Sequence, residues 1–154
     1  MKNARLIDGK AKAAELAKKI KEETAILLSK GITPGLAVII IGDNPASNVY
    51  VKNKKRTAEA YGFYSIKHSL EESVEQKDII DLIEELNNNP KIHGILIQLP
   101  LPTHLDEDII TQSVSPEKDV DGFHYRNIGK LHSGNVKETF IPCTPAGCML
   151  MIED

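Results

Sequence analysis

A continuous apolar run at residues 36–41, LAVIII, constrains the fold more than any other segment of this chain. Most of its residues are β-branched, and no polar residue interrupts it. Such a run is typical of a strand that is buried on both faces, as in a parallel sheet. Pro34 and Gly35 precede the run and Gly42 follows it, which bounds the strand at both ends. The run therefore predicts a central strand that needs helices on each face of its sheet.

The segments around this run alternate between helical and strand-like patterns. The predicted helices cover residues 8–29, the stretch from the 42–46 loop to Gly62, residues 76–87, residues 106–113 and a last segment from about Pro145. The predicted further strands cover residues 63–70 and 94–99. Strands that alternate with helices typically lie parallel, because each helix crosses back over the sheet. The pattern predicts an α/β fold, a three-layer βαβ domain with a mainly parallel sheet.

The composition is that of a soluble globular domain. Of 154 residues, 41% are hydrophobic and 27% are charged, which allows one domain with its own core. No apolar run approaches the roughly 18 residues that a membrane span needs, and the first residues lack the apolar core of a signal peptide. The net charge of -3 argues against nucleic acid as a partner. We therefore expect a cytoplasmic protein that binds neither membranes nor nucleic acid.

The cysteines and histidines show no pattern of metal ligands. Cys143 and Cys148 stand alone near the end of the chain, and the five histidines are scattered. Two thiols without clustered histidines make a poor zinc site, so we expect no metal. In a reducing compartment both thiols stay free, and we expect them to be ordinary packing residues.

Tyr50 and Lys54 are the first candidates for chemistry. They are four residues apart in a predicted helix, so their side chains lie on one face. A phenol ring can stack on a flat heterocycle while a neighbouring amine handles protons. If partly buried, Lys54 would have a lowered pKa and could act as a base near neutral pH.

Two further polar residues lie near the carboxyl ends of the predicted strands. Gln98 interrupts an apolar strand near its end, and Asp121 lies beside a glycine in the 119–124 segment. Ligands of open α/β sheets bind beyond the carboxyl ends of the strands, where these side chains would gather. With Tyr50 and Lys54 they suit a planar nitrogen heterocycle. A carboxylate can accept hydrogen bonds from the amino group and the ring N–H of such a heterocycle.

Each of these residues also has a purely structural interpretation. Tyr50 could be a half-buried core residue. Gln98 could satisfy a backbone group at the strand end, and Asp121 could bond to amides of its own turn. Only their occurrence together at one edge of the sheet favours a binding site.

Four ordered segments carry a resemblance to a known family. They are GDNPASNVYVKNK at 42–54, GILIQLPLP at 94–102, KDVDGFH at 118–124 and PCTPAG at 142–147. The chain resembles bifunctional methylenetetrahydrofolate dehydrogenase/methenyltetrahydrofolate cyclohydrolase enzymes over its whole length. The resemblance implies the oxidation of 5,10-methylenetetrahydrofolate with NADP and the hydrolysis of the methenyl product to 10-formyltetrahydrofolate, in a homodimeric parent protein.

The resemblance also implies roles for individual residues. Tyr50 stacks on the folate ring, Lys54 is the central catalytic residue and Gln98 hydrogen-bonds to that lysine. Asp121 anchors the amino edge of the pterin. Further residues of the implied folate cleft are Leu99, Pro100, Leu101 and Val120.

The chain departs from the family pattern in one large respect. No glycine-rich phosphate loop follows a strand, so the residues that would bind the nicotinamide cofactor are not identified. We expect residues 1–145 to form a folate-binding catalytic domain and residues 146–154 to start the helix that leads to a Rossmann domain absent here. The same absence argues against a short-chain dehydrogenase, which shares the Tyr-x-x-x-Lys spacing. An alternative is that the chain alone is a folate-binding module without turnover.

Overall fold

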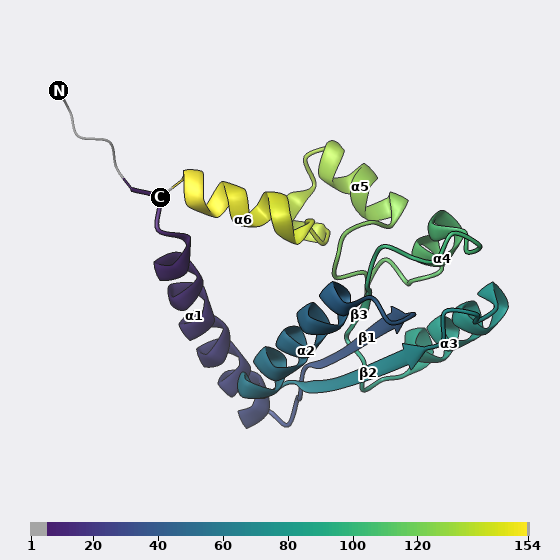
Figure 1. Ribbon diagram of the computed structural model, residues 1–154. Coiled ribbons are helices and arrows are strands. Elements are labelled where there is room, and N and C mark those ends of the chain that lie inside the picture. Colours follow the sequence, from purple (N-terminus) through teal and green to yellow (C-terminus); the bar gives the residue numbers. More distant parts are fainter. Residues whose placement is uncertain (1–5, 154) are drawn as a thin grey trace.

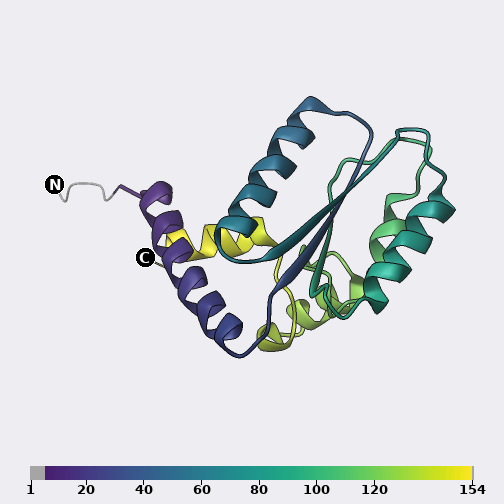
Figure 2. The ribbon, with the colours of Figure 1, turned by 90° about the horizontal axis from the view of Figure 1, so that it is seen from below.

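A three-stranded parallel sheet forms the centre of the computed structural model, which describes residues 6–153 of the chain (Figures 1 and 2). The strand order is β2-β1-β3, and the strands are β1 (Gly35–Ile41), β2 (Tyr64–Leu70) and β3 (Gly94–Ile97). The predicted α/β fold with its parallel sheet is thus confirmed. Strand β3 ends two residues earlier than predicted. Gln98 N still donates to Ile39 O at 2.8 Å, but Pro100 has no N–H with which to continue the ladder.

Six α-helices and one 3-10 helix occur in the part of the chain that the structure describes. They are α1 (Gly9–Ser29), α2 (Pro45–Ala60), α3 (Gln76–Asn88), α4 (Glu107–Gln112), α5 (Tyr125–His132), η1 (Val136–Glu138) and α6 (Cys143–Ile152). Sequence patterns predicted all of these except α5 and η1. Helix α5 begins after His124, whose Nδ1 accepts from Arg126 N at 3.0 Å. Histidine is an uncommon helix cap, so the usual start signal was missing.

Helices cover both faces of the sheet, as the three-layer prediction requires. Side chains of alternate strand residues point to opposite faces. Ile39 and Ile97 lie in the larger buried cluster, which they share with residues of α3 and α4. Val38, Ile40 and Leu96 lie in a second buried cluster with Val51 of α2. The alternation therefore assigns a face to each residue near the strand ends.

Helices α1 and α6 lie outside these layers (Figure 1). Thr24 is the buried residue of α1, and no residue of α6 is buried although that helix is almost entirely apolar. The two helices approach each other, since a Cβ placed on Gly9 would lie 3.3 Å from the Met151 sulfur. Apolar helices are usually covered in a stable protein. Helix α6 also starts two residues before the predicted Pro145.

No helix within residues 6–153 combines the length and apolarity required to cross a lipid bilayer.

Candidate active site

Helix α2 presents Tyr50 and Lys54 as the helical spacing predicts. Asn44 Oδ1 accepts from Ser47 N at 3.2 Å at the start of the helix. Val51 is fully buried against the sheet, which orients the helix. The Lys54 amine lies over the Tyr50 ring, with Nζ 4.4 Å from the ring centroid. A cation at this distance is attracted to the face of the ring. Tyr50 itself is mostly exposed, so its other face is open to solvent.

Lys54 and Asp121 are electrostatic neighbours, although 67 positions separate them in the chain. Burial lowers the pKa of the half-buried Lys54 amine, and the Asp121 carboxylate partly opposes this shift. Burial raises the pKa of the Asp121 carboxyl. The positive charge of Lys54 lowers this pKa, and the negative charge of Asp119 raises it further. Opposite charges that are both partly desolvated and titrate away from their ordinary ranges are typical of functional sites.

Gln98 lies on the same face of the sheet as α2. Side chains two residues apart in a strand point to the same face, so Gln98 shares the face of Leu96, which lies in the cluster of Val51. The parallel register, continued by one residue, places Gln98 beside Ile40. Gln98 Nε2 donates to Leu99 O at 2.8 Å. Gln98 Oε1 is buried and has no hydrogen-bond partner, so Lys54 does not donate to it in this structure. An unpaired buried acceptor costs about 1–3 kcal/mol, and a ligand or a shifted lysine could relieve that cost.

The predicted lining residues do not all lie on one face. Val120 packs against the cluster beneath α2, whereas Leu99 and Leu101 pack against the cluster beneath α3 and α4. Pro100 and Leu101 border a hollow of about 350 Å³ together with the 41–44 turn. Asp121 borders a separate small cavity with Ile97. The structure therefore links Tyr50 to Lys54 by a ring contact and Lys54 to Asp121 electrostatically, whereas Leu99 and Leu101 pack on the opposite face of the sheet.

Cys143 is a member of this site that sequence reasoning missed. The prediction that both cysteines are packing residues is wrong, because Cys143 and Cys148 are both exposed. Cys143 Sγ lies 3.9 Å from Val120 O, and Cys143 raises the Lys54 pKa in the same direction as Asp121 does. The signal available in the sequence was the position of Cys143 directly after Pro142, where α6 begins.

The described residues offer neither a metal centre nor a dinucleotide site. Within residues 6–153, no group of three or more His, Cys, Asp or Glu side chains could hold a metal ion. The turns that follow β1, β2 and β3 carry Asp43, Glu72 and Pro100 respectively. Acidic side chains and a missing N–H are unsuited to the pyrophosphate of a nucleotide, which needs a row of backbone donors.

Comparisons with known proteins identify the family of this chain. Residues 7–121 match the family described as tetrahydrofolate dehydrogenase/cyclohydrolase, catalytic domain. The bifunctional protein FolD of Brucella anthropi is 53% identical over 151 residues, which are 97% of this chain and 50% of that protein. The chain thus spans about half the length of the curated relatives it matches.

Two solved structures have a closely similar fold. The bifunctional FolD methylenetetrahydrofolate dehydrogenase/cyclohydrolase of Campylobacter jejuni superposes with a TM-score of 0.94 at 46% identity, over 97% of this chain and 52% of its own. The Trypanosoma brucei methylenetetrahydrofolate dehydrogenase-cyclohydrolase, in complex with NADP and an inhibitor, gives a TM-score of 0.90 at 35% identity. The aligned region covers 99% of this chain and 52% of the Trypanosoma brucei chain.

Proposed function

The chain belongs to the tetrahydrofolate dehydrogenase/cyclohydrolase family, and from this we propose that it supplies the folate site and the catalytic lysine of a bifunctional enzyme. The complete enzyme oxidises 5,10-methylenetetrahydrofolate with NADP and hydrolyses the 5,10-methenyl product to 10-formyltetrahydrofolate. The observation that carries the proposal is the half-buried Lys54–Asp121 pair, in which the amine has a lowered pKa and the carboxyl a raised one. That pair lies beside an exposed aromatic ring.

In the proposed hydrolysis, water attacks the electrophilic methenyl carbon while the neutral Lys54 amine removes a proton from the water. The resulting ammonium returns this proton to the ring nitrogen, and the carbon–nitrogen bond then breaks. As the carbonyl forms, the remaining hydroxyl proton passes to the neutral Lys54 amine and from there to solvent, which leaves the formyl group on the other nitrogen. Proton transfer by a positioned side chain contributes roughly 10²–10⁴-fold to a rate. Burial favours this role for Lys54, because it makes the neutral amine available at lower pH.

The remaining residues bind and orient the substrate in this proposal. Tyr50 stacks on the pterin through its exposed face. Asp121 accepts hydrogen bonds from the pterin amino group and ring N–H. Gln98 Oε1, now unpaired, accepts from the Lys54 amine once the substrate has ordered the site. Leu99, Pro100 and Val120 contribute apolar walls.

NADP belongs to the complete enzyme and not to the described residues, which do not fit it. In this proposal the folate-binding catalytic domain extends to about residue 145, and helix α6, which overlaps this boundary because it begins at Cys143, leads to an NAD(P)-binding Rossmann domain. Two facts support this division: the chain spans about half the length of its relatives, and the apolar helix α6 has no buried residue. A partner domain that covers α6 accounts for both.

The same proposal places the protein in the cytoplasm as part of a homodimer. The free thiols of Cys143 and Cys148 are typical of a reducing compartment. The net charge of -3 suits a small-molecule enzyme better than one that binds nucleic acid. The homodimer rests on the family resemblance alone.

Loss of methenyltetrahydrofolate absorbance tests the hydrolytic role directly. We expect the protein expressed from its complete reading frame to accelerate the loss above the buffer rate, because Lys54 supplies a base that bulk solvent lacks. The 154-residue chain is assayed in parallel, with binding of 5-formyltetrahydrofolate measured by calorimetry. Binding without acceleration by the 154-residue chain would identify it as a passive folate-binding module. No binding by either protein would contradict the proposed function.

The pH dependence of hydrolysis should report the Lys54 pKa. Because the amine must be neutral to accept a proton, the maximal rate is expected to rise with pH and to level off above that pKa. Burial lowers this pKa, so the midpoint should lie below that of an ordinary lysine. Asp121 raises the Lys54 pKa, and Asp121→Asn should therefore move the midpoint to still lower pH. The measurement is kcat against pH with the buffer rate subtracted; a midpoint that rises in Asp121→Asn would refute the assignment.

A further inference from the structure

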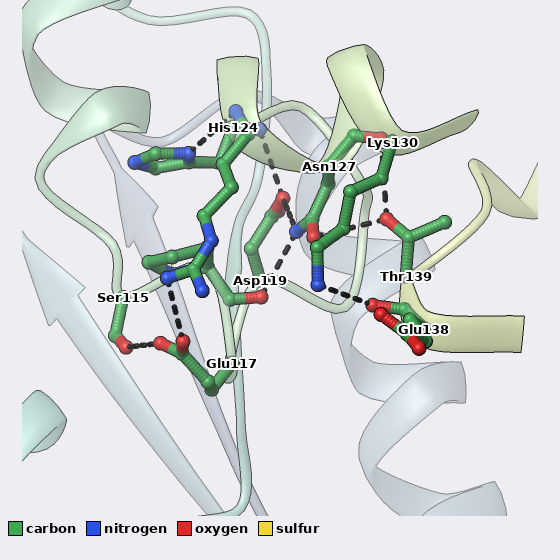
Figure 3. A network of polar contacts seen from close by, with 10 residues as sticks. Ser115, Glu117, Asp119, His124, Asn127, Lys130, Glu138 and Thr139 are labelled. Carbon is green, nitrogen blue, oxygen red and sulfur yellow. Dashed lines mark hydrogen bonds and ion pairs between the residues drawn. The ribbon is translucent and has the colours of Figure 1, made fainter. Parts of the chain in front are cut away.

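A buried polar network adjoins the turn that carries Asp121 (Figure 3). Asp119 is 5% exposed and Asn127 of α5 is 3% exposed. Asp119 Oδ2 accepts from His124 N at 2.8 Å and from Asn127 Nδ2 at 2.8 Å. The first bond closes the 119–124 turn on itself, and the second ties it to α5. A buried carboxylate needs such donors, because an unpaired buried charge is strongly destabilising.

The Asn127 side chain joins this turn to a distant segment. Its Nδ2 also donates to Pro116 O at 2.9 Å, so both amide protons are used. Thr139 Oγ1 lies 3.0 Å from Asn127 Oδ1, 3.1 Å from Asn127 O and 3.3 Å from Phe140 O, and Asn127 Oδ1 is the nearest of these three acceptors for its single proton. The hydrogen-bonding capacity of the Asn127 amide is thus satisfied from both sides, which fixes its orientation.

The segment that follows Thr139 packs directly against the Asp121 turn. Gly122 has a φ of +69°, and a Cβ placed there would lie 2.8 Å from Phe140 O and 3.0 Å from Pro142. The same segment continues into Cys143, whose Sγ lies 3.9 Å from Val120 O. The turn is therefore held between α5 on one side and residues 140–143 on the other.

Polar contacts at the rim of this network are exposed and weaker. Arg126 pairs with Glu117 at 2.9 Å, and Lys130 Nζ donates to Glu138 O at 2.9 Å. Exposed ion pairs contribute little to stability because water screens them, whereas buried hydrogen-bond networks depend on every member. The buried pair of Asp119 and Asn127, together with the half-buried Thr139, is thus the part that determines the geometry.

We infer that Asn127 and Thr139 are positioning residues, which hold the 119–124 turn so that the Asp121 carboxylate meets the amino edge of the substrate. The inference rests on the proposed function, because that function assigns Asp121 to the amino edge. Asn127 and Thr139 act through Asp121, so the benefit of the Thr139 hydroxyl should depend on the presence of the Asp121 carboxylate. An ordinary stabilising residue would show no such dependence.

A double-mutant cycle with Thr139→Val and Asp121→Asn tests this dependence. The readout is the Kd of 5-formyltetrahydrofolate for protein from the complete reading frame, measured by calorimetry. We expect Thr139→Val to raise Kd about tenfold in the wild-type background, because it leaves a buried acceptor unpaired. In the Asp121→Asn background the same change should alter Kd less than about twofold. Thr139→Ser, which keeps the hydroxyl, should restore binding to near the wild-type level.

Two controls keep the result interpretable. Arg126→Gln removes the exposed ion pair at the rim and should leave Kd unchanged. If Thr139→Val does not fold, the cycle is repeated with Thr139→Ala, which also lacks the hydroxyl but does not introduce the branched side chain of valine. Equal increases in Kd in both backgrounds would overturn the inference alone. Failure of the wild-type protein to bind would overturn the proposed function, and the inference with it.

Discussion

Replacing Lys54 with methionine is expected to lower the rate of methenyltetrahydrofolate hydrolysis by at least about a hundredfold. Methionine keeps an unbranched side chain of similar length but has no amine to take the proton of the attacking water. The helix that carries residue 54 should persist, because Val51 and not Lys54 anchors it to the sheet. The measurement is the steady-state loss of substrate absorbance at saturating substrate.

Folate affinity should change little in the same variant, by about threefold or less, if Lys54 acts mainly in the chemical step. Lys54 lowers the pKa of Asp121, so its loss raises that pKa further. Affinity should therefore be compared over a series of pH values, because the loss of Lys54 moves the ionisation of Asp121 to higher pH. Lys52→Met, on an exposed residue of the same helix, is the matched control. Undiminished hydrolysis by Lys54→Met would rule out a catalytic role for the amine.

The second large effect is expected on affinity, from Asp121→Asn. An asparagine of the same shape offers one acceptor and no charge, so it cannot accept both N–H groups of the pterin edge. Hydrogen bonds to a charged group contribute about 1.5–3 kcal/mol, and the loss should weaken folate binding about a hundredfold. Calorimetry with 5-formyltetrahydrofolate measures the change.

Thermal unfolding separates this loss from damage to the fold. Burial raises the Asp121 pKa, which means that the folded protein disfavours the carboxylate. With a folded pKa above the unfolded one, the ionised group destabilises the protein at neutral pH. The Tm of Asp121→Asn should therefore not fall. Asp78→Asn, in the exposed first turn of α3, is the control and should alter neither Kd nor Tm. Wild-type affinity in Asp121→Asn would remove the carboxylate from the proposed site.

Local patterns were sufficient for most of the architecture. The uninterrupted LAVIII run predicted the buried central strand, and helical spacing predicted that Tyr50 and Lys54 share a face. Both features depend on neighbours in the chain, and backbone periodicity converts them directly into geometry. The end of β3 was less predictable, because Gln98 extends the ladder by one hydrogen bond before Pro100 stops it.

Other features had no local signal. Helix α5 begins after His124, which lacks the usual capping chemistry, and the exposure of Cys143 contradicts the average behaviour of cysteine. The role of Asn127 depends on Asp119 and Thr139 at once, and a buried hydrogen bond is defined only when all partners are in place. Such residues look unremarkable one at a time.

By itself, the sequence determined the strand order, the helices other than α5 and η1, the parallel sheet and the family motifs with Tyr50, Lys54, Gln98 and Asp121. Only the tertiary structure decided that Lys54 and Asp121 perturb each other, that Gln98 keeps an unpaired oxygen and that Asn127 holds the Asp121 turn. The physical reason is that periodicity follows from the covalent backbone, whereas pKa shifts and buried hydrogen bonds depend on burial and on partners distant in the chain.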